Sequence, residues 1–156
     1  MLKTSSLTPY ERAIICDKDT EHPGTGRYTD YEGTGTYLCR NCGLALFRSK
    51  HKFHSGCGWP SFDNEVTGNV KRVMDKDGRR TEILCSRCNA HLGHVFHGEG
   101  YTPLDTRHCV NSASLDFVRS ADVSDTEEAI LAAGCFWGVE YYLKQLNGGL
   151  KNRSRL

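Results

Sequence analysis

The chain has 156 residues, of which 38% are hydrophobic and 25% charged, and its net charge is +1. The length suits one domain of ordinary size with a possible appendage, and the balanced charge gives no general attraction to nucleic acid or to an anionic membrane. No apolar run approaches the roughly 18 residues of a membrane-spanning helix, and residues 1–6 lack the apolar stretch typical of a signal peptide. We therefore expect a reducing compartment, most simply the cytoplasm.

The N-terminal part predicts a short helix followed by an extended segment. Thr8 has the character of an N-cap and Pro9 that of a first helical residue, so the helix is expected to continue through Cys16. Residues 21–36 are rich in glycine, threonine and tyrosine. They predict an extended loop that leads into a strand.

Two CxxC pairs lie within strand-like sequence. Residues 37–39 enter the first pair and residues 44–47 leave it, which predicts a strand, a metal-binding turn and a second strand. Residues 70–74 and 80–85, joined by a turn at 75–78, predict a hairpin whose second strand enters the other pair.

Two later segments predict further strands, and a polar segment predicts a domain boundary. Residues 91–96 and 107–118 complete a mostly antiparallel β-domain, which we place at 1–120. Residues 121–128 are polar and acidic and predict a linker. The remainder, 129–156, begins with a strand-to-turn pattern.

Four cysteines in two CxxC pairs predict a structural zinc site, because thiolates are the preferred ligands of closed tetrahedral zinc. The 42 residues between the two pairs make a long insertion, but loop closure becomes costlier only slowly with length. Redox-active pairs or free buried thiols are the alternatives. His91 and His94 are not needed as ligands once four thiolates fill the shell. The expected ligands are Cys39, Cys42, Cys85 and Cys88.

Cys109 lies outside this cluster and is the candidate reactive thiol. If residues 107–111 form a strand, alternation places Arg107, Cys109 and Asn111 on one face. A nearby cation favours the thiolate, which is the nucleophilic form. An ordinary buried cysteine is the alternative for this segment taken alone.

Two other segments carry matching chemistry. Cys57 lies between two glycines, and Trp59 and Phe62 offer an apolar wall of the kind that holds a methyl-sulfur group. A hydrophobic turn that fills the core is the alternative. His91 and His94 could supply a proton near neutral pH, although isolated histidines more often serve packing or the surface.

Together these motifs resemble the methionine-R-sulfoxide reductases, the B type. The resemblance covers about residues 7–118 and rests on long ordered motifs. They are the two CxxC pairs, GCGWPSF at 56–62, HLGHVF at 91–96 and RHCVNSASLDF at 107–117.

The resemblance implies a mainly β fold of two antiparallel sheets, small N-terminal helices and a structural zinc away from the active site. It implies that Cys109 is the nucleophile, Cys57 the resolving thiol and Trp59 the methyl-binding wall. The polar pocket would be completed by Arg107, His91, His94 and Asn111. The expected substrates are oxidised proteins or peptides, and a thioredoxin-type reductant would recycle the thiols.

Residues 132–140 resemble the start of the A-type methionine-S-sulfoxide reductases around their nucleophilic cysteine, here Cys135. We expect residues 129–156 to be too short to complete that fold. The competing interpretation of the whole chain is a zinc-ribbon binding module. It explains the CxxC pairs but not Cys57, Cys109 or the aromatic run.

Overall fold

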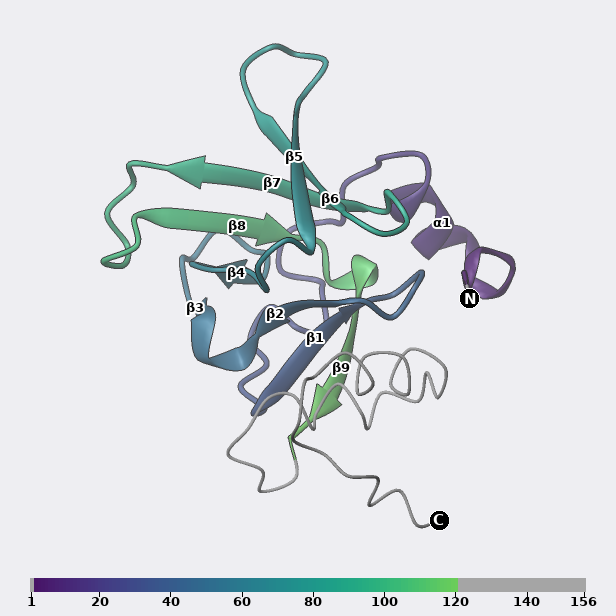
Figure 1. The fold of residues 1–156 in the computed structure, drawn as a ribbon, viewed down its shortest axis with the longest axis horizontal. Coiled ribbons are helices and arrows are strands. Elements are labelled where there is room, and N and C mark those ends of the chain that lie inside the picture. The colour runs from purple at the N-terminus through teal and green to yellow at the C-terminus, as the bar shows by residue number, and fades with distance from the viewer. Residues whose placement is uncertain (1, 121–156) are drawn as a thin grey trace, which may run out of the picture.

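The computed structural model describes residues 2–120, so the predicted linker at 121–128 and the segment 129–156 lie outside the described residues. The expected fold class is confirmed: two antiparallel sheets are accompanied by a few short helices. In Figure 1 the smaller sheet lies below the larger one, and the N-terminal helix packs beside them.

The N-terminal helix forms where the capping residues predict it. A short 3₁₀ helix at Thr4–Ser6 precedes helix α1, Pro9–Ile15. The Thr8 hydroxyl accepts a hydrogen bond from the Glu11 amide at 3.2 Å, and the Glu11 carboxylate accepts one from the Thr8 amide at 2.9 Å. This capping box satisfies two of the free N–H groups at the helix start. Within residues 2–120 no helix has the length and apolar character to cross a membrane.

The smaller sheet has three strands in the order β2-β1-β9. Its strands are β1 at Gly35–Cys39, β2 at Ala45–Arg48 and β9 at Leu115–Arg119. The turn between β1 and β2 carries the first CxxC pair, as the sequence predicts.

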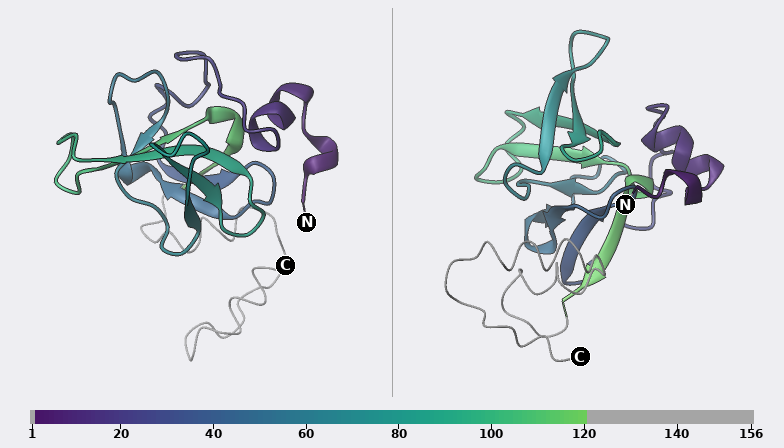
Figure 2. Two further views of the ribbon diagram at one scale, coloured as in Figure 1. Left: turned by 90° about the horizontal axis from the view of Figure 1, so that it is seen from above. Right: turned by 45° about the vertical axis from the view of Figure 1, so that its right-hand side comes forward.

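The larger sheet has six strands in the order β3-β4-β8-β7-β6-β5, and each neighbouring pair is antiparallel. The β5–β6 hairpin is confirmed and projects from the sheet, as Figures 1 and 2 show. The strands are β3 (Lys52–Phe53), β4 (Ser61–Phe62), β5 (Val70–Met74), β6 (Thr81–Cys85), β7 (His91–His97) and β8 (Thr106–Val110).

The predicted β-segment at 107–118 contributes strands to both sheets. Strand β8 ends at Val110, a 3₁₀ turn occupies Ser112–Ser114, and β9 then crosses to the smaller sheet. Side chains stabilise this crossing: the Asn111 amide donates to the Leu92 carbonyl at 3.1 Å, and the Ser114 hydroxyl donates to the His91 carbonyl at 2.8 Å. These bonds between side chains and the backbone mark the point at which the chain leaves one sheet for the other.

The core lies between the sheets and is rich in aromatic rings. Phe62 of β4 stacks on Phe47 of β2 with ring centroids 4.4 Å apart, and Tyr37 of β1 meets Phe62 edge-on at 5.0 Å. All three rings are fully buried. Such pairs add about 0.5–1.5 kcal/mol each beyond the burial of their area.

Gly93 of β7 is required by a close approach between strands. A Cβ at this position would collide with the backbone carbonyl of Cys109, and the residue has φ +155°. We expect Gly93→Ala to lower the free energy of unfolding by about 3 kcal/mol, since both strain and overpacking contribute. Urea unfolding measures the change.

The matched control is Gly68→Ala, where φ is +81° but no atom lies within 4 Å of the added Cβ. This variant should lose only about 1 kcal/mol, the cost of the unfavourable φ alone. Equal losses in the two variants would contradict the steric argument.

Candidate active site

Two cysteines far apart in sequence meet at the surface of the larger sheet. The sulfurs of Cys57 and Cys109 lie 3.9 Å apart. Cys109 is in β8, an interior strand, and Cys57 is in the loop between β3 and β4. Both thiols are partly exposed. A small movement of the loop would bring them within disulfide distance.

Strand alternation decides which neighbours face the thiols. Arg107 and Cys109 share one face of β8, while His108 points to the other face and is buried against Phe47 and Phe62. In the ladder, Cys109 is paired with Ser61 on β4. The Ser61 hydroxyl lies 3.6 Å from the Cys57 sulfur, so it supports the second thiol from the same face.

The two thiols share one hydrogen bond, and this sets their ionisation. A hydrogen bond from the Cys109 thiol lowers the pKa of Cys57 to about 4, although burial acts in the opposite direction. Hydrogen bonds from the hydroxyls of Ser55 and Ser61 lower this pKa further. The same hydrogen bond, followed by burial, raises the pKa of Cys109, whereas the charge of Arg107 lowers it. The pair therefore carries one thiolate and one thiol near neutral pH, and the remaining proton belongs to the pair.

Arg107 is held beside the thiols by two contacts. Its guanidinium donates to the Glu99 carboxylate at 2.8 and 3.2 Å and lies over the Phe96 ring at 4.6 Å. A fixed cation stabilises negative charge on Cys109 more effectively than a mobile one, because no side-chain entropy is lost when the charge develops.

The two predicted histidines lie on β7 in different environments. His94 is paired with Cys109 across the ladder, and its Nε2 lies 2.7 Å from the Asp75 carboxylate. His91 lies 2.7 Å from the Glu82 carboxylate and is 3% exposed, and burial lowers its pKa. His94 is thus the histidine that accompanies the thiol pair.

Trp59 and Asn111 are linked through one backbone segment. The Trp59 indole donates to the Glu21 carbonyl at 2.9 Å, and the Asn111 side-chain carbonyl accepts from the Glu21 amide at 3.0 Å. Asn111 is buried and bonds only backbone groups in the described part of the chain. It therefore fixes the backbone at Glu21, to which the Trp59 indole is hydrogen-bonded. Trp59 itself is partly exposed.

The structure does not bring Phe62 to the thiols. Its ring is fully buried in the core, on the face of the sheet opposite Cys109. Cys16, the third thiol outside the four-cysteine cluster in the described part of the chain, is exposed at the end of α1 and makes no bond to either site sulfur. Cys135 lies outside the described residues.

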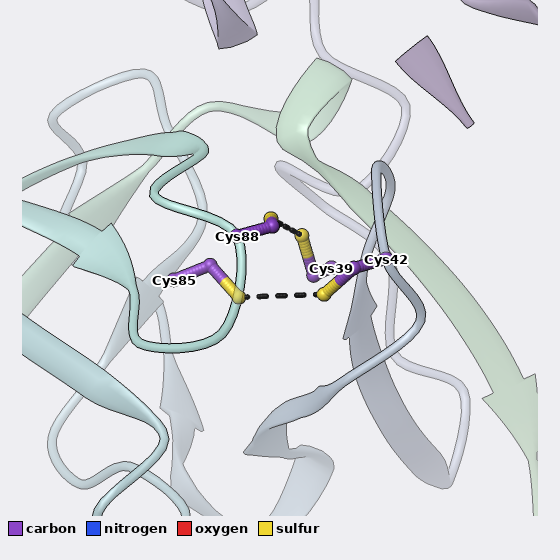
Figure 3. A group of neighbouring side chains, drawn as sticks. All are labelled: Cys39, Cys42, Cys85 and Cys88. Carbon is purple, nitrogen blue, oxygen red and sulfur yellow. Dashed lines mark hydrogen bonds between the residues drawn. The ribbon is translucent and has the colours of Figure 1, made fainter. Parts of the chain in front are cut away.

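The remaining four predicted cysteines form a compact cluster, drawn in Figure 3. Their sulfurs all lie within 4.8 Å of one another, with Cys39 and Cys88 at 3.6 Å and Cys42 and Cys85 at 3.5 Å. Hydrogen bonding to the other three thiols raises the pKa of Cys39. Four sulfurs this close can all ionise only around a cation, and the cluster could therefore bind a metal ion.

Several residues at the site have no sequence signal. Glu99, Asp75 and Ser61 each come from a loop or a short strand whose pattern predicts only turns or core. Glu99 and Ser61 lie only 8 and 4 residues from their partners, Arg107 and Cys57, across a turn and a loop. Asp75 lies 19 residues from His94, so only the folded sheet brings that pair together.

The comparisons with known proteins agree with the motifs. The model of the SelR domain family matches residues 7–119. The chain is 50% identical over 116 residues to peptide methionine sulfoxide reductase B3 of Arabidopsis thaliana. This match covers 74% of the chain and 66% of that protein.

Two rice proteins give a similar result. The chain is 53% identical over 112 residues to peptide methionine sulfoxide reductase B5 of Oryza sativa subsp. japonica, covering 71% of this chain and 82% of that protein. It is 50% identical over 119 residues to peptide methionine sulfoxide reductase B3, chloroplastic, of the same organism. That match covers 76% of this chain and 52% of that protein. The match thus spans from about half to about four fifths of the length of these three relatives.

The shared proton predicts an unusual pH dependence of alkylation. In the reduced protein, Cys57 should react with iodoacetamide with a midpoint near its pKa of about 4, because the thiolate is the reactive form. Cys109→Ala removes the hydrogen bond that contributes most, so the midpoint should move upward. Mass spectrometry of the Cys57 peptide across a pH series measures both, with Cys109→Ser as the control that keeps a donor. A wild-type midpoint at the roughly 8.5 of a free thiol would contradict the pairing.

Proposed function

The chain belongs to the SelR-domain family of B-type peptide methionine sulfoxide reductases, and on this premise we propose that it reduces methionine-R-sulfoxide, free or protein-bound, at Cys109. The observation that carries the proposal is the Cys57–Cys109 pair at 3.9 Å, with Arg107 and His94 on the same face of the sheet.

The substrate would lie between Trp59 and strand β8. The methyl group on the sulfoxide sulfur packs against the exposed part of the indole, and the sulfur faces Cys109. The oxygen then points toward β7, where His94 is the nearest candidate acid. Only one epimer satisfies these three contacts at once, which accounts for a preference for the R form.

The first step oxidises Cys109 and reduces the substrate. Cys109 passes its proton to the Cys57 thiolate, and Arg107 stabilises the new negative charge. The Cys109 thiolate attacks the sulfoxide sulfur, His94 protonates the oxygen, and that oxygen ends on Cys109 as a sulfenic acid. Methionine leaves as its sulfur gains the two electrons that Cys109 loses.

The second step recycles the thiols. The Cys57 sulfur attacks the Cys109 sulfenic acid as its proton passes to the leaving hydroxyl, so the sulfur–oxygen bond breaks and a disulfide and water result. A dithiol reductant of the thioredoxin type then restores both thiols by exchange. The need for free thiols supports a reducing compartment, most simply the cytoplasm, and we propose no role for nucleic acid or membrane.

The four-cysteine cluster fits a structural zinc ion. Zinc–sulfur bonds of about 2.3 Å in a tetrahedron separate the sulfurs by about 3.8 Å, close to the 3.5 and 3.6 Å seen here. Zinc would be held by Cys39, Cys42, Cys85 and Cys88. It would supply folding energy and no reaction step, because four thiolates leave no open position.

For the C-terminal part we propose the boundaries that the sequence predicts: a linker at 121–128 and the start of an A-type reductase at 129–156. Two observations support them. The family match ends at residue 119, and the A-type motif around Cys135 follows it.

Replacing each site thiol should separate reduction from recycling. Cys109→Ser should release no methionine, because a hydroxyl is a far weaker nucleophile at neutral pH. Cys57→Ser should release up to one methionine per enzyme in a burst and then stop under thioredoxin-driven conditions. A quench-flow assay on chiral methionine sulfoxide measures both.

Cys16→Ser is the matched control and should keep full turnover. A burst in Cys109→Ser but none in Cys57→Ser would reverse the two roles. Equal rates on both epimers would contradict the three-contact arrangement.

The metal cluster gives a separate prediction. The purified, reduced protein should contain one zinc per chain by metal analysis. Cys88→Ser should lose the zinc and lower the Tm by about 10 °C or more, because structural zinc contributes folding energy directly. Full zinc content and an unchanged Tm in this variant would exclude Cys88 as a ligand.

A further inference from the structure

The tip of the β5–β6 hairpin, residues 75–80, reaches the active site from outside the CxxC, GCGWPSF, HLGHVF and RHCVNSASLDF motifs. Asp75 directly follows β5, and its Oδ2 lies 2.7 Å from Nε2 of His94 on β7. The two side chains are 20% and 15% exposed, so the contact is at the edge of the site. It joins the projecting hairpin to the strand that runs beside Cys109.

The turn itself fixes the Asp75 carboxylate. Its backbone amide donates to the Arg80 carbonyl at 2.8 Å, and its carbonyl accepts from the Gly78 amide at 2.9 Å. The Lys76 amide donates to Oδ1 at 2.6 Å. These bonds leave Oδ2 directed at His94, with the Arg80 guanidinium at 3.3 Å on its other side. The carboxylate is thus held in place before His94 meets it.

This contact decides which nitrogen of His94 faces the substrate. A carboxylate can only accept, so Nε2 carries the proton that points to Asp75. Within residues 2–120, Nδ1 of His94 has no hydrogen-bond partner. Because His94 is paired with Cys109, their Cβ atoms lie about 5 Å apart. Nδ1 is therefore the nitrogen available to the sulfoxide oxygen.

The neighbouring His91–Glu82 pair shows why we assign the proton donor to His94. His91 also meets a carboxylate, that of Glu82, but the side chains are only 3% and 5% exposed and Lys18 binds the same carboxylate at 2.9 Å. A substrate oxygen cannot reach that imidazole. Of the two carboxylate–histidine pairs that involve β7, Asp75–His94 is the one open to the surface.

We infer that Asp75 is a positioning residue for the reduction step, which orients His94 with Nδ1 toward the substrate and stabilises its imidazolium form. The inference rests on the proposed function. It makes the hairpin tip a part of the active site, although no atom of Asp75 touches the reacting groups.

The pH dependence follows from the charges around His94. The hydrogen bond from His94 lowers the pKa of Asp75, so the carboxylate is charged across the neutral range and its contact is lost only in acid. Asp75→Asn removes this negative charge from beside the proton donor, so the alkaline limb of the pH–rate profile should move to lower pH. The other charged or titratable groups that face His94 or Asp75 are Arg80, Asp77, Glu82, His91, Cys57 and Cys109.

The test compares Asp75→Asn with a matched variant of the same turn, Asp77→Asn. Asp77 accepts from the Arg79 and Arg80 amides at 2.8 and 3.0 Å and pairs with Arg80, but does not contact His94. Single-turnover release of methionine from methionine-R-sulfoxide is followed across pH. Asp75→Asn should lower the rate constant at saturating sulfoxide about tenfold or more and leave the half-saturating sulfoxide concentration within about twofold. It should also shift the alkaline limb of the pH–rate profile to lower pH. Asp77→Asn should stay within about twofold of wild type.

A double-mutant cycle tests whether Asp75 acts through His94. In a His94→Asn background, Asp75→Asn should add less than about a twofold loss, since the residue it positions is gone. An equal loss of rate from Asp75→Asn in both backgrounds would overturn the inference. An unchanged pH–rate profile in Asp75→Asn would also overturn it, and so would equal losses of rate in Asp75→Asn and Asp77→Asn.

A readout without turnover separates this inference from the proposed function. The ¹⁵N shifts of His94 report which ring nitrogen carries the proton, and they should differ between wild type and Asp75→Asn. Identical shifts would overturn the inference even in an active enzyme. A wild type that releases no methionine would overturn the proposed function and, with it, the catalytic role of Asp75.

Discussion

The four-cysteine cluster is the constraint on which the rest of the structure depends, because it ties the two sheets together at one end. Cys39 and Cys42 occupy the turn between β1 and β2 of the smaller sheet, and Cys85 and Cys88 occupy the turn between β6 and β7 of the larger one. Strand β7 leaves this cluster directly and carries both histidines. The position of the cluster therefore sets how far β7 extends beside β8, and so which residue lies opposite Cys109.

At the site, Arg107 and His94 are each held by a carboxylate, while the two thiols are hydrogen-bonded to each other. Glu99 fixes Arg107, Asp75 fixes His94, and the Cys57–Cys109 pair shares a proton. A negative charge can thus move between the two sulfurs without any side chain changing its position. Preorganised charges of this kind lower a barrier because little reorganisation remains when charge develops.

The local parts of the fold follow from the sequence. The capping residues predict α1 and the Asp-Lys-Asp-Gly turn predicts the β5–β6 hairpin, because each depends on bonds between near neighbours. The CxxC spacing predicts the cluster for another reason: its four thiols suit one metal ion, although the two pairs are far apart in the chain. The division of residues 107–118 does not follow, since Asn111 and Ser114 bond to β7, about twenty residues away. Nor does the position of Phe62, whose face of the sheet is set by its ladder with β8 and its stacking on Phe47.

By itself, the sequence determined which residue types are available: two CxxC pairs, a thiol beside an arginine, a second thiol between glycines and two histidines three apart. Motifs of this length identify the chemistry because they list the reacting groups. Only the tertiary structure decided that Cys57 and Cys109 face each other, that His94 rather than His91 accompanies them, and that Asp75 reaches across from a hairpin tip. The physical reason is that strand pairing, and not spacing along the chain, sets which side chains share a face and which are buried.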